Sequence, residues 1–134
     1  MGSWVKGIDA ITLFVEDLPA SKAFYQNVFG IPWIHEDDDA AAFVLQGVAI
    51  NLLRSRAAHE LIEPEAVGEP GGGSRVLLTV GVDDVDTVCA ELASRGVGLL
   101  NGPMDRPWGI RTASFADPDG HVWEIAHRLP KSEE

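Results

Sequence analysis

The sequence predicts an α+β fold in which two tandem βαβββ modules form a single domain over residues 1–134. Three observations support this prediction. A strand pattern, a helix pattern and three short strand patterns follow one another over residues 8–55, and the same order returns over residues 76–128. The segment FVEDL also matches GVDDV at the same place in the second series, as expected for a duplicated unit. Residues 56–75 lack periodicity and contain GEPGGGSR, so we expect a linker there.

The first module begins with a strand pattern at residues 8–17, where apolar side chains alternate between the two faces. Asp17 is a suitable helix N-cap, Pro19 suits a first turn, and Gly30 suits a helix end, so we expect a helix between them. Gly47 allows a tight turn between the second and third of the strands that follow. These three strand candidates are PWIHE, AAFVLQG and VAINLLRS.

The second module repeats this order with different residues. RVLLTVGVDD is typical of a strand, and DVDTVCAELASRG is typical of a helix with one apolar stripe. The strand candidates that follow are VGLLNG, IRTASFA and HVWEIAH. A shift of 67 residues pairs Thr12 with Thr79, and the closing strands pair Asn51 with Glu124. We therefore expect these positions to be equivalent in the two modules.

Composition narrows the possible partners. The formal net charge of −11 repels nucleic acid and anionic membrane surfaces, so we expect neither as a partner. The single cysteine, Cys89, excludes an internal disulfide. Neither a basic-then-apolar leader nor an apolar run of spanning length is found, so we expect a cytoplasmic protein. Small molecules and a second copy of the chain are the expected partners.

Three separated motifs carry a family resemblance: ITLFVEDLPASKAFYQNVFGI, VGVDDVD and WGIRTASFADPDGHVWEI. Together with the internal repeat, they are similar to the vicinal oxygen chelate superfamily of glyoxalases, extradiol dioxygenases, fosfomycin-modifying proteins and bleomycin-binding resistance proteins. The resemblance covers about residues 8–128. It implies a curved mixed sheet cup around a ligand cavity, helices on the outside, and a homodimer.

The resemblance also implies four metal-ligand positions, which correspond here to Ala10, Asn51, Leu77 and Glu124. Only Glu124 is an ordinary ligand, because Ala10 and Leu77 have no donor atom and an amide oxygen binds zinc, nickel or iron weakly. We therefore expect no cofactor, with a divalent metal as the alternative. The other histidines and Cys89 are more typical of turns, surfaces or core, and none is expected to replace the missing ligands.

The hairpin around ADPDGH decides what lies near Glu124. Pairing Phe115 with Val122 places Arg111 on the face of Glu124, where the two side chains could form a charge-assisted pair. The two residues could bind a polar group of a ligand, or they could equally form a structural ion pair at the cavity rim without any ligand. Trp108, between arginines and before a flexible glycine, is suited to stacking on a ring or to capping the core edge.

The residues expected to line the cavity, which are mostly apolar or aromatic with a few hydroxyls, predict the function. We expect a metal-free binding protein that sequesters an aromatic or polycyclic compound in an apolar cup, as the antibiotic-binding resistance members of the family do. The alternatives are a lyase, isomerase or dioxygenase-like enzyme that uses Glu124 as metal ligand or general base, and a scaffold whose cavity its own side chains fill. The predicted ligand-binding residues are Thr12, Phe14, Trp33, Phe43, Asn51, Thr79, Trp108, Arg111, Phe115 and Glu124.

Overall fold

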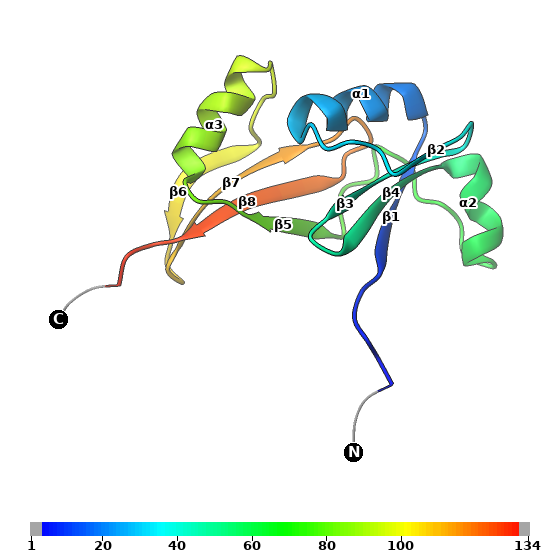
Figure 1. Cartoon of the computed structure of the whole chain (residues 1–134), viewed down its shortest axis with the longest axis horizontal. Helices are drawn as coiled ribbons and strands as arrows, with labels where there is room; N and C mark the ends of the chain where they lie inside the picture. The colour runs from blue at the N-terminus through cyan, green and yellow to red at the C-terminus, as the bar shows by residue number, and fades with distance from the viewer. Residues whose placement is uncertain (1–3, 132–134) are drawn as a thin grey trace. The chain divides into compact units, whose positions relative to one another are not determined.

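The computed structural model describes residues 4–131, which divide into two compact units with a boundary between Glu69 and Pro70 (Figure 1). Each unit has one four-stranded mixed sheet and a helix packed on one of its faces. The order of elements confirms the predicted α+β fold of two tandem βαβββ modules. The boundary lies inside the segment predicted as a linker.

The first unit has the strand order β1-β4-β3-β2, in which β1 and β4 are parallel and the other neighbours are antiparallel. Strand β2 has only two residues, fewer than the segment PWIHE predicts. The bounds are β1 Ala10–Val15, α1 Leu18–Val28, β2 His35–Glu36, β3 Ala40–Leu45, β4 Val48–Arg54 and α2 Ser55–Ile62.

Helix α1 begins where the sequence predicts it, because the Asp17 carboxylate accepts a hydrogen bond from the Ala20 amide at 3.1 Å. Its buried face includes Tyr25, whose ring lies 5.8 Å from that of Phe43 on β3. Alternation along the strands places Leu13 of β1 on this same, helix-covered face. An aromatic and aliphatic core therefore lies between α1 and the first sheet.

Helix α2 spans Ser55–Ile62, and its residues 56–62 lie in the segment predicted as a linker. Its N-cap, Arg54, makes no side-chain capping bond, and for this reason the usual start signal is missing. Ala58 of α2 is fully buried against Leu53, and Phe14 packs on this cluster. The helix therefore covers one end of the sheet face that is turned away from α1.

The second unit has the strand order β5-β8-β7-β6, with β5 and β8 parallel. Helix α3 buries Val85, Cys89 and Leu92. Strand β6 begins at Asn101, four residues later than the segment VGLLNG predicts, and its register with β7 shifts between Asn101 and Met104. The bounds are β5 Leu77–Gly81, α3 Val85–Ser94, β6 Asn101–Arg106, β7 Ile110–Ala116 and β8 Val122–Arg128.

The helices in the described part of the chain are too short or too polar to cross a membrane. Within residues 4–131, none of them combines the length and the apolar character that crossing a bilayer requires.

Candidate functional site

Glu124 lies in a row of register partners across the second sheet. Thr79 of β5 pairs with Glu124 of β8, and Glu124 pairs with Ser114 of β7. The Thr79 hydroxyl donates a hydrogen bond to Glu124 Oε1 at 2.9 Å. Alternation places these side chains on the sheet face turned away from α3, because His127, three positions after Glu124, accepts a bond from the first amide of α3. We call this surface the Glu124 face; it comprises Thr79, Thr112, Ser114 and Glu124.

An arginine adds the opposite charge to the Glu124 face. Arg106 Nε donates to the Thr112 hydroxyl at 2.9 Å, and Arg106 Nη2 donates to Asn101 Oδ1 at 3.1 Å. Two apolar residues on this face are exposed, Leu77 by 52% and Met104 by 41%. A ligand on this face would therefore meet the Glu124 carboxylate, the Thr79 hydroxyl and apolar surface within one sheet.

The first unit carries an equivalent pair. Thr12 and Asn51 are register partners on parallel strands, as Thr79 and Glu124 are, and Asn51 Nδ2 donates to Thr12 Oγ1 at 3.5 Å. The structure thus places the residues that the repeat pairs in matching positions. An amide stands in the first unit where the second has a carboxylate.

The β7–β8 hairpin differs from the predicted register by one residue. Phe115 pairs with Trp123, and it is Ala116 that pairs with Val122. Asp117 sets this register, because its Oδ1 accepts bonds from the amides of Asp119 and His121. A shift of one residue moves every side chain of a strand to the other face. Arg111 and Phe115 therefore lie on the α3 side, and their predicted placement beside Glu124 is wrong.

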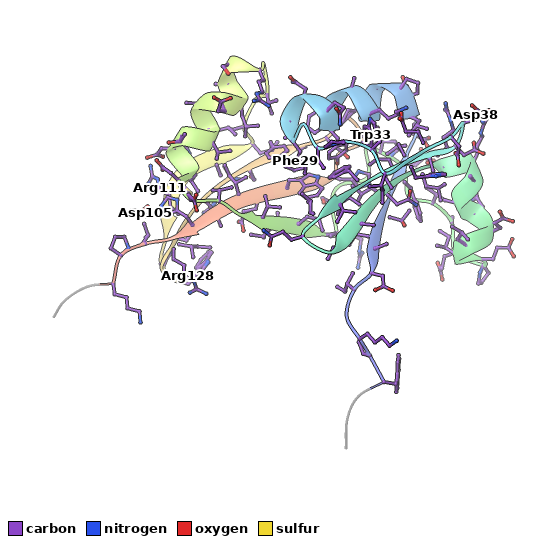
Figure 2. The ribbon with its side chains drawn as sticks, in the orientation of Figure 1. Phe29, Trp33, Asp38, Asp105, Arg111 and Arg128 are labelled. Carbon is purple, nitrogen blue, oxygen red and sulfur yellow. The ribbon has the colours of Figure 1, made fainter. Side chains whose placement is uncertain are left out.

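Arg111 belongs to an ionic cluster on the α3 side of the second sheet. Its Nη1 donates to Asp105 at 2.8 Å, and its Nε donates to Asp86 of α3 at 3.0 Å (Figure 2). The hydrogen bond to Asp105, and then that to Asp86, raise the pKa of this guanidinium above its ordinary value. Arg111 thus ties α3 to β6 and does not pair with Glu124.

The predicted aromatic lining is mostly core. Phe43 is 1% exposed and Phe115 is fully buried, each on the helix-covered face of its sheet. Trp33 packs with its ring 5.7 Å from that of Phe43 (Figure 2 labels Trp33). Phe14 packs on the α2 cluster, whereas Trp108, in the β6–β7 turn, is 69% exposed. Of the five predicted aromatic residues, Trp108 is largely exposed, Phe14 and Trp33 are half-buried, and Phe43 and Phe115 belong to the core.

Sequence reasoning missed Thr112, Ser114 and Arg106. The first two occupy the positions on β7 that the predicted register gave to Arg111 and Ala113. They are nearly buried, at 1% and 6% exposure, although both carry hydroxyls. The available signal was polar alternation in IRTASFA, where Thr and Ser stand two residues apart. Arg106 was considered as one of the two arginines beside Trp108 and not as a strand residue of this face, because glycine and proline in β6 conceal the strand.

The donor set does not fit the metal site that the resemblance implies. Ala10 and Leu77 are exposed on the expected strands, yet neither side chain has a lone pair to donate. Within residues 4–131, no group of three or more His, Cys, Asp or Glu side chains is arranged to hold a metal ion. His121 is bound to Asp117 at 2.7 Å, and this bond raises its pKa above the usual 6.5. It therefore serves the hairpin turn.

Comparison with known proteins agrees with this architecture. The model of the Glyoxalase/Bleomycin resistance protein/Dioxygenase superfamily matches residues 7–125. Protein YraH of Bacillus subtilis (strain 168) is 34% identical over 123 residues, which cover 89% of this chain and 96% of that protein. Metallothiol transferase FosB of Lysinibacillus sphaericus is 26% identical, covering 90% of this chain and 82% of that protein.

A solved structure is similar over almost the whole length. The crystal structure of a glyoxalase/bleomycin resistance protein/dioxygenase from Nocardioides superposes with a TM-score of 0.86 at 27% identity, covering 98% of this chain and 89% of that chain. The sequence motifs, the repeated module and these matches agree. The chain belongs to the glyoxalase/bleomycin resistance protein/dioxygenase superfamily, as the motifs predict.

Proposed function

We propose that this chain is a small-molecule-binding protein that acts without a metal cofactor and holds an organic cation against the Glu124 face. The observation that carries the proposal is the Glu124 carboxylate, oriented by the Thr79 hydroxyl and flanked by Ser114. A carboxylate with fixed orientation is a natural counter-ion for a ligand ammonium or amidinium group. The acidic protein, with a net charge of −11, would attract such a ligand from a distance.

The apolar part of the ligand would contact exposed side chains near this carboxylate. Leu77 and Met104 offer apolar area on the Glu124 face, and Trp108 in the neighbouring turn offers a ring for stacking. An aromatic or polycyclic amine combines both requirements. We therefore still propose that the protein sequesters an aromatic compound, and we add that this compound carries a cationic group. Phe43, Phe115 and Arg111 are no longer among the proposed ligand-binding residues. A cytoplasmic homodimer is part of this proposal, and light scattering on the purified chain tests the dimer.

The donor atoms at the family's metal-ligand positions favour binding without a metal. Glu124 and Asn51 are the only two of the four family positions with an oxygen donor, and transition metals in proteins require more and better ligands. A ligand that is held by hydrogen bonds and apolar contact needs no Lewis acid.

A metal-dependent enzyme is the second candidate, and one observation favours it. The metallothiol transferases are relatives at 26% identity, and Glu124 keeps a residue type that can bind a metal or act as a base. In that case Glu124 would coordinate the ion, and a lyase, isomerase or dioxygenase-like reaction would depend on it.

Calorimetric titration tests the first candidate. The probes are aromatic amines, each paired with its neutral analogue, and the variants are Glu124→Gln and Glu65→Gln. Glu65 is an exposed carboxylate of the first unit, so its variant removes the same charge away from the site. We expect binding of amines only, weakened roughly tenfold or more in Glu124→Gln and unchanged in Glu65→Gln. Equal weakening in both variants, or a preference for the neutral analogues, would contradict the proposal.

A further inference from the structure

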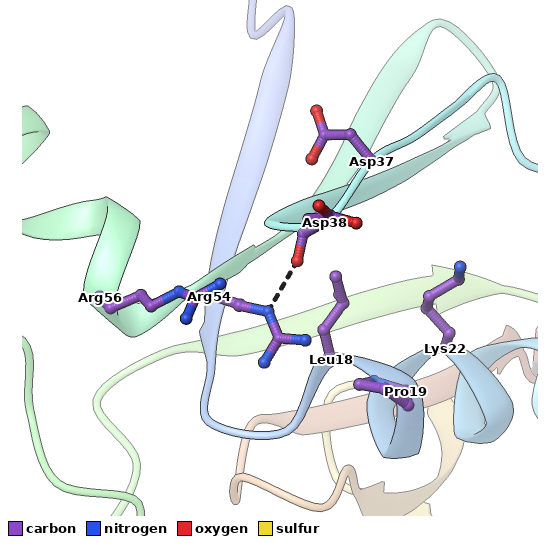
Figure 3. A pocket seen from close by; sticks show the side chains of 7 residues that line it. All are labelled: Leu18, Pro19, Lys22, Asp37, Asp38, Arg54 and Arg56. Carbon is purple, nitrogen blue, oxygen red and sulfur yellow. Dashed lines mark hydrogen bonds between the residues drawn. The ribbon is translucent and has the colours of Figure 1, made fainter.

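The first unit contains a pocket that is separate from the Glu124 face. Its volume is about 530 Å³, and it lies where α1 begins, beside the end of β4 and the acidic loop of residues 37–39 between β2 and β3 (Figure 3). Arg54 has the strand parity of Leu52, so it lies on the α1 side of the sheet, opposite to Thr12 and Asn51. The lining residues are Leu18, Pro19, Lys22, Asp37, Asp38, Arg54 and Arg56.

Most charged groups around the pocket already have partners. The Lys22 ammonium pairs with Glu36, and Arg56 donates two bonds to one oxygen of Asp39, at 3.2 and 3.1 Å. Asp37 accepts bonds from two main-chain amides and binds His35. The Asp39 amide, then His35 and the Ala40 amide hold the pKa of Asp37 below its ordinary value. These contacts fix the shape of the acidic loop.

Arg54 is different because no carboxylate neutralises it. Its Nε donates to the main-chain carbonyl of Asp38 at 2.7 Å, and it forms no ion pair with any residue in the described part of the chain. This bond fixes the guanidinium while its two terminal nitrogens remain available. Figure 3 shows the guanidinium beside Leu18, within the ring of lining side chains. A positioned arginine with free terminal N–H groups suits two-pronged binding of an oxyanion.

We propose that this pocket binds a small oxyanion, a carboxylate or phosphate group, with Arg54 as its anchor. Lys22 and Arg56 also line the pocket, but they are paired with Glu36 and Asp39, so Arg54 supplies the positive charge for the anion. The protein as a whole repels anions, so the attraction is local and weakens with added salt. The carboxylates of Asp37 and Asp38, which also line the pocket, oppose an anion and limit its affinity.

The test uses the full chain at low ionic strength, with NMR titration of inorganic phosphate in one arm and acetate in the other. The reporters are the Arg54 Nε–H and the main-chain amides of Leu18 and Lys22. We expect saturable shifts at these groups. Arg54→Gln should weaken binding at least about tenfold, because it removes the charge and the donor fork together. The relative affinity in the two arms shows whether phosphate or carboxylate is the preferred group.

Three further variants make the result decisive. Arg54→Lys keeps the charge and should lie between the wild type and Arg54→Gln, whereas Asp38→Asn should tighten binding about two- to tenfold. Arg128→Gln removes an exposed positive charge from the second unit and should change nothing (Figure 2 labels Arg128). If Arg54→Gln fails to fold, the opposite effects of Arg54→Lys and Asp38→Asn still carry the test. The proposal is overturned by shifts without saturation, or by Arg128→Gln weakening binding as much as the Arg54 variants.

Discussion

The Thr79 hydroxyl donates a hydrogen bond to the Glu124 carboxylate at 2.9 Å, and the two residues are register partners on parallel strands. The pair Thr12 and Asn51 occupies the same relationship in the first unit. One threonine therefore orients a charged group and the other a neutral one. Of these two equivalent pairs, the one in the second unit therefore carries the carboxylate that our proposal assigns to a cationic ligand.

Replacing Thr79 with valine removes the donor and keeps the shape of the side chain. We expect affinity for the aromatic amine probes to fall about two- to tenfold, since Glu124 loses the bond that orients it. Thr12→Val is the matched control and should leave affinity unchanged. Calorimetry on the three proteins measures this, and equal losses in both variants would show that the effect is not specific to Glu124.

The hairpin turn predicts a pH dependence. The Asp117 hydrogen bond raises the pKa of His121 above 6.5 in the folded chain, so the protonated form is favoured by folding. This contribution to stability is fully present below pH 6.5 and is lost as the pH rises through the folded-state pKa. Melting temperatures measured across neutral pH should therefore fall more steeply with rising pH in the wild type than in His121→Gln. Parallel profiles would show that the pair does not contribute.

Gly102 predicts a steric effect in β6. A Cβ atom at this position would lie 2.5 Å from the Thr112 carbonyl oxygen and 2.7 Å from the Ala113 Cα. The backbone φ of Gly102 is +86°, which is unfavourable for residues other than glycine. We expect Gly102→Ala to lower the free energy of unfolding by roughly 2–4 kcal/mol. Gly98→Ala is the control, because a Cβ there meets nothing within 4 Å. Urea denaturation compares them, and similar values for both variants would contradict the close approach.

Because Phe43 belongs to the core, replacing it should lower stability without weakening the binding of the amine probes. Its ring is buried among Tyr25, Phe29 and Trp33 on the α1 side of the first sheet. Phe43→Ala should lower the free energy of unfolding by about 3–5 kcal/mol. Val44→Ala, on the opposite face and 37% exposed, should cost far less. If the folded Phe43→Ala protein lost affinity for the amine probes, the assignment of this ring to the core would be wrong.

Much of the fold was predictable because the local strand and helix patterns occur in the same order in both repeated modules. Alternating strands, the Asp17 cap and the apolar stripe of α3 each predict an element that forms. The equivalence of Thr12 with Thr79 was also predictable, because a duplicated unit keeps its internal register. Helix α2 was missed, since it follows β4 directly and has no capping side chain.

The candidate site was less predictable because it depends on hairpin register. The Asp117 carboxylate closes the turn by accepting hydrogen bonds from amides two and four residues later, and the alternation of the two strands does not specify the register that these bonds set. The resulting shift of one residue placed Thr112 and Ser114 on the Glu124 face in place of Arg111 and Ala113. Glu124 itself was placed correctly, because strand alternation from Trp123 and Ile125 is independent of the partner strand.

The metal content of the chain tests the central claim most directly. The chain would be purified without chelator, dialysed against zinc, nickel, manganese and iron in turn, and measured by mass spectrometry beside Glu124→Ala. Our account predicts far less than one equivalent of any metal and no difference between the two proteins. One tightly held equivalent in the wild type that is lost in Glu124→Ala would contradict it.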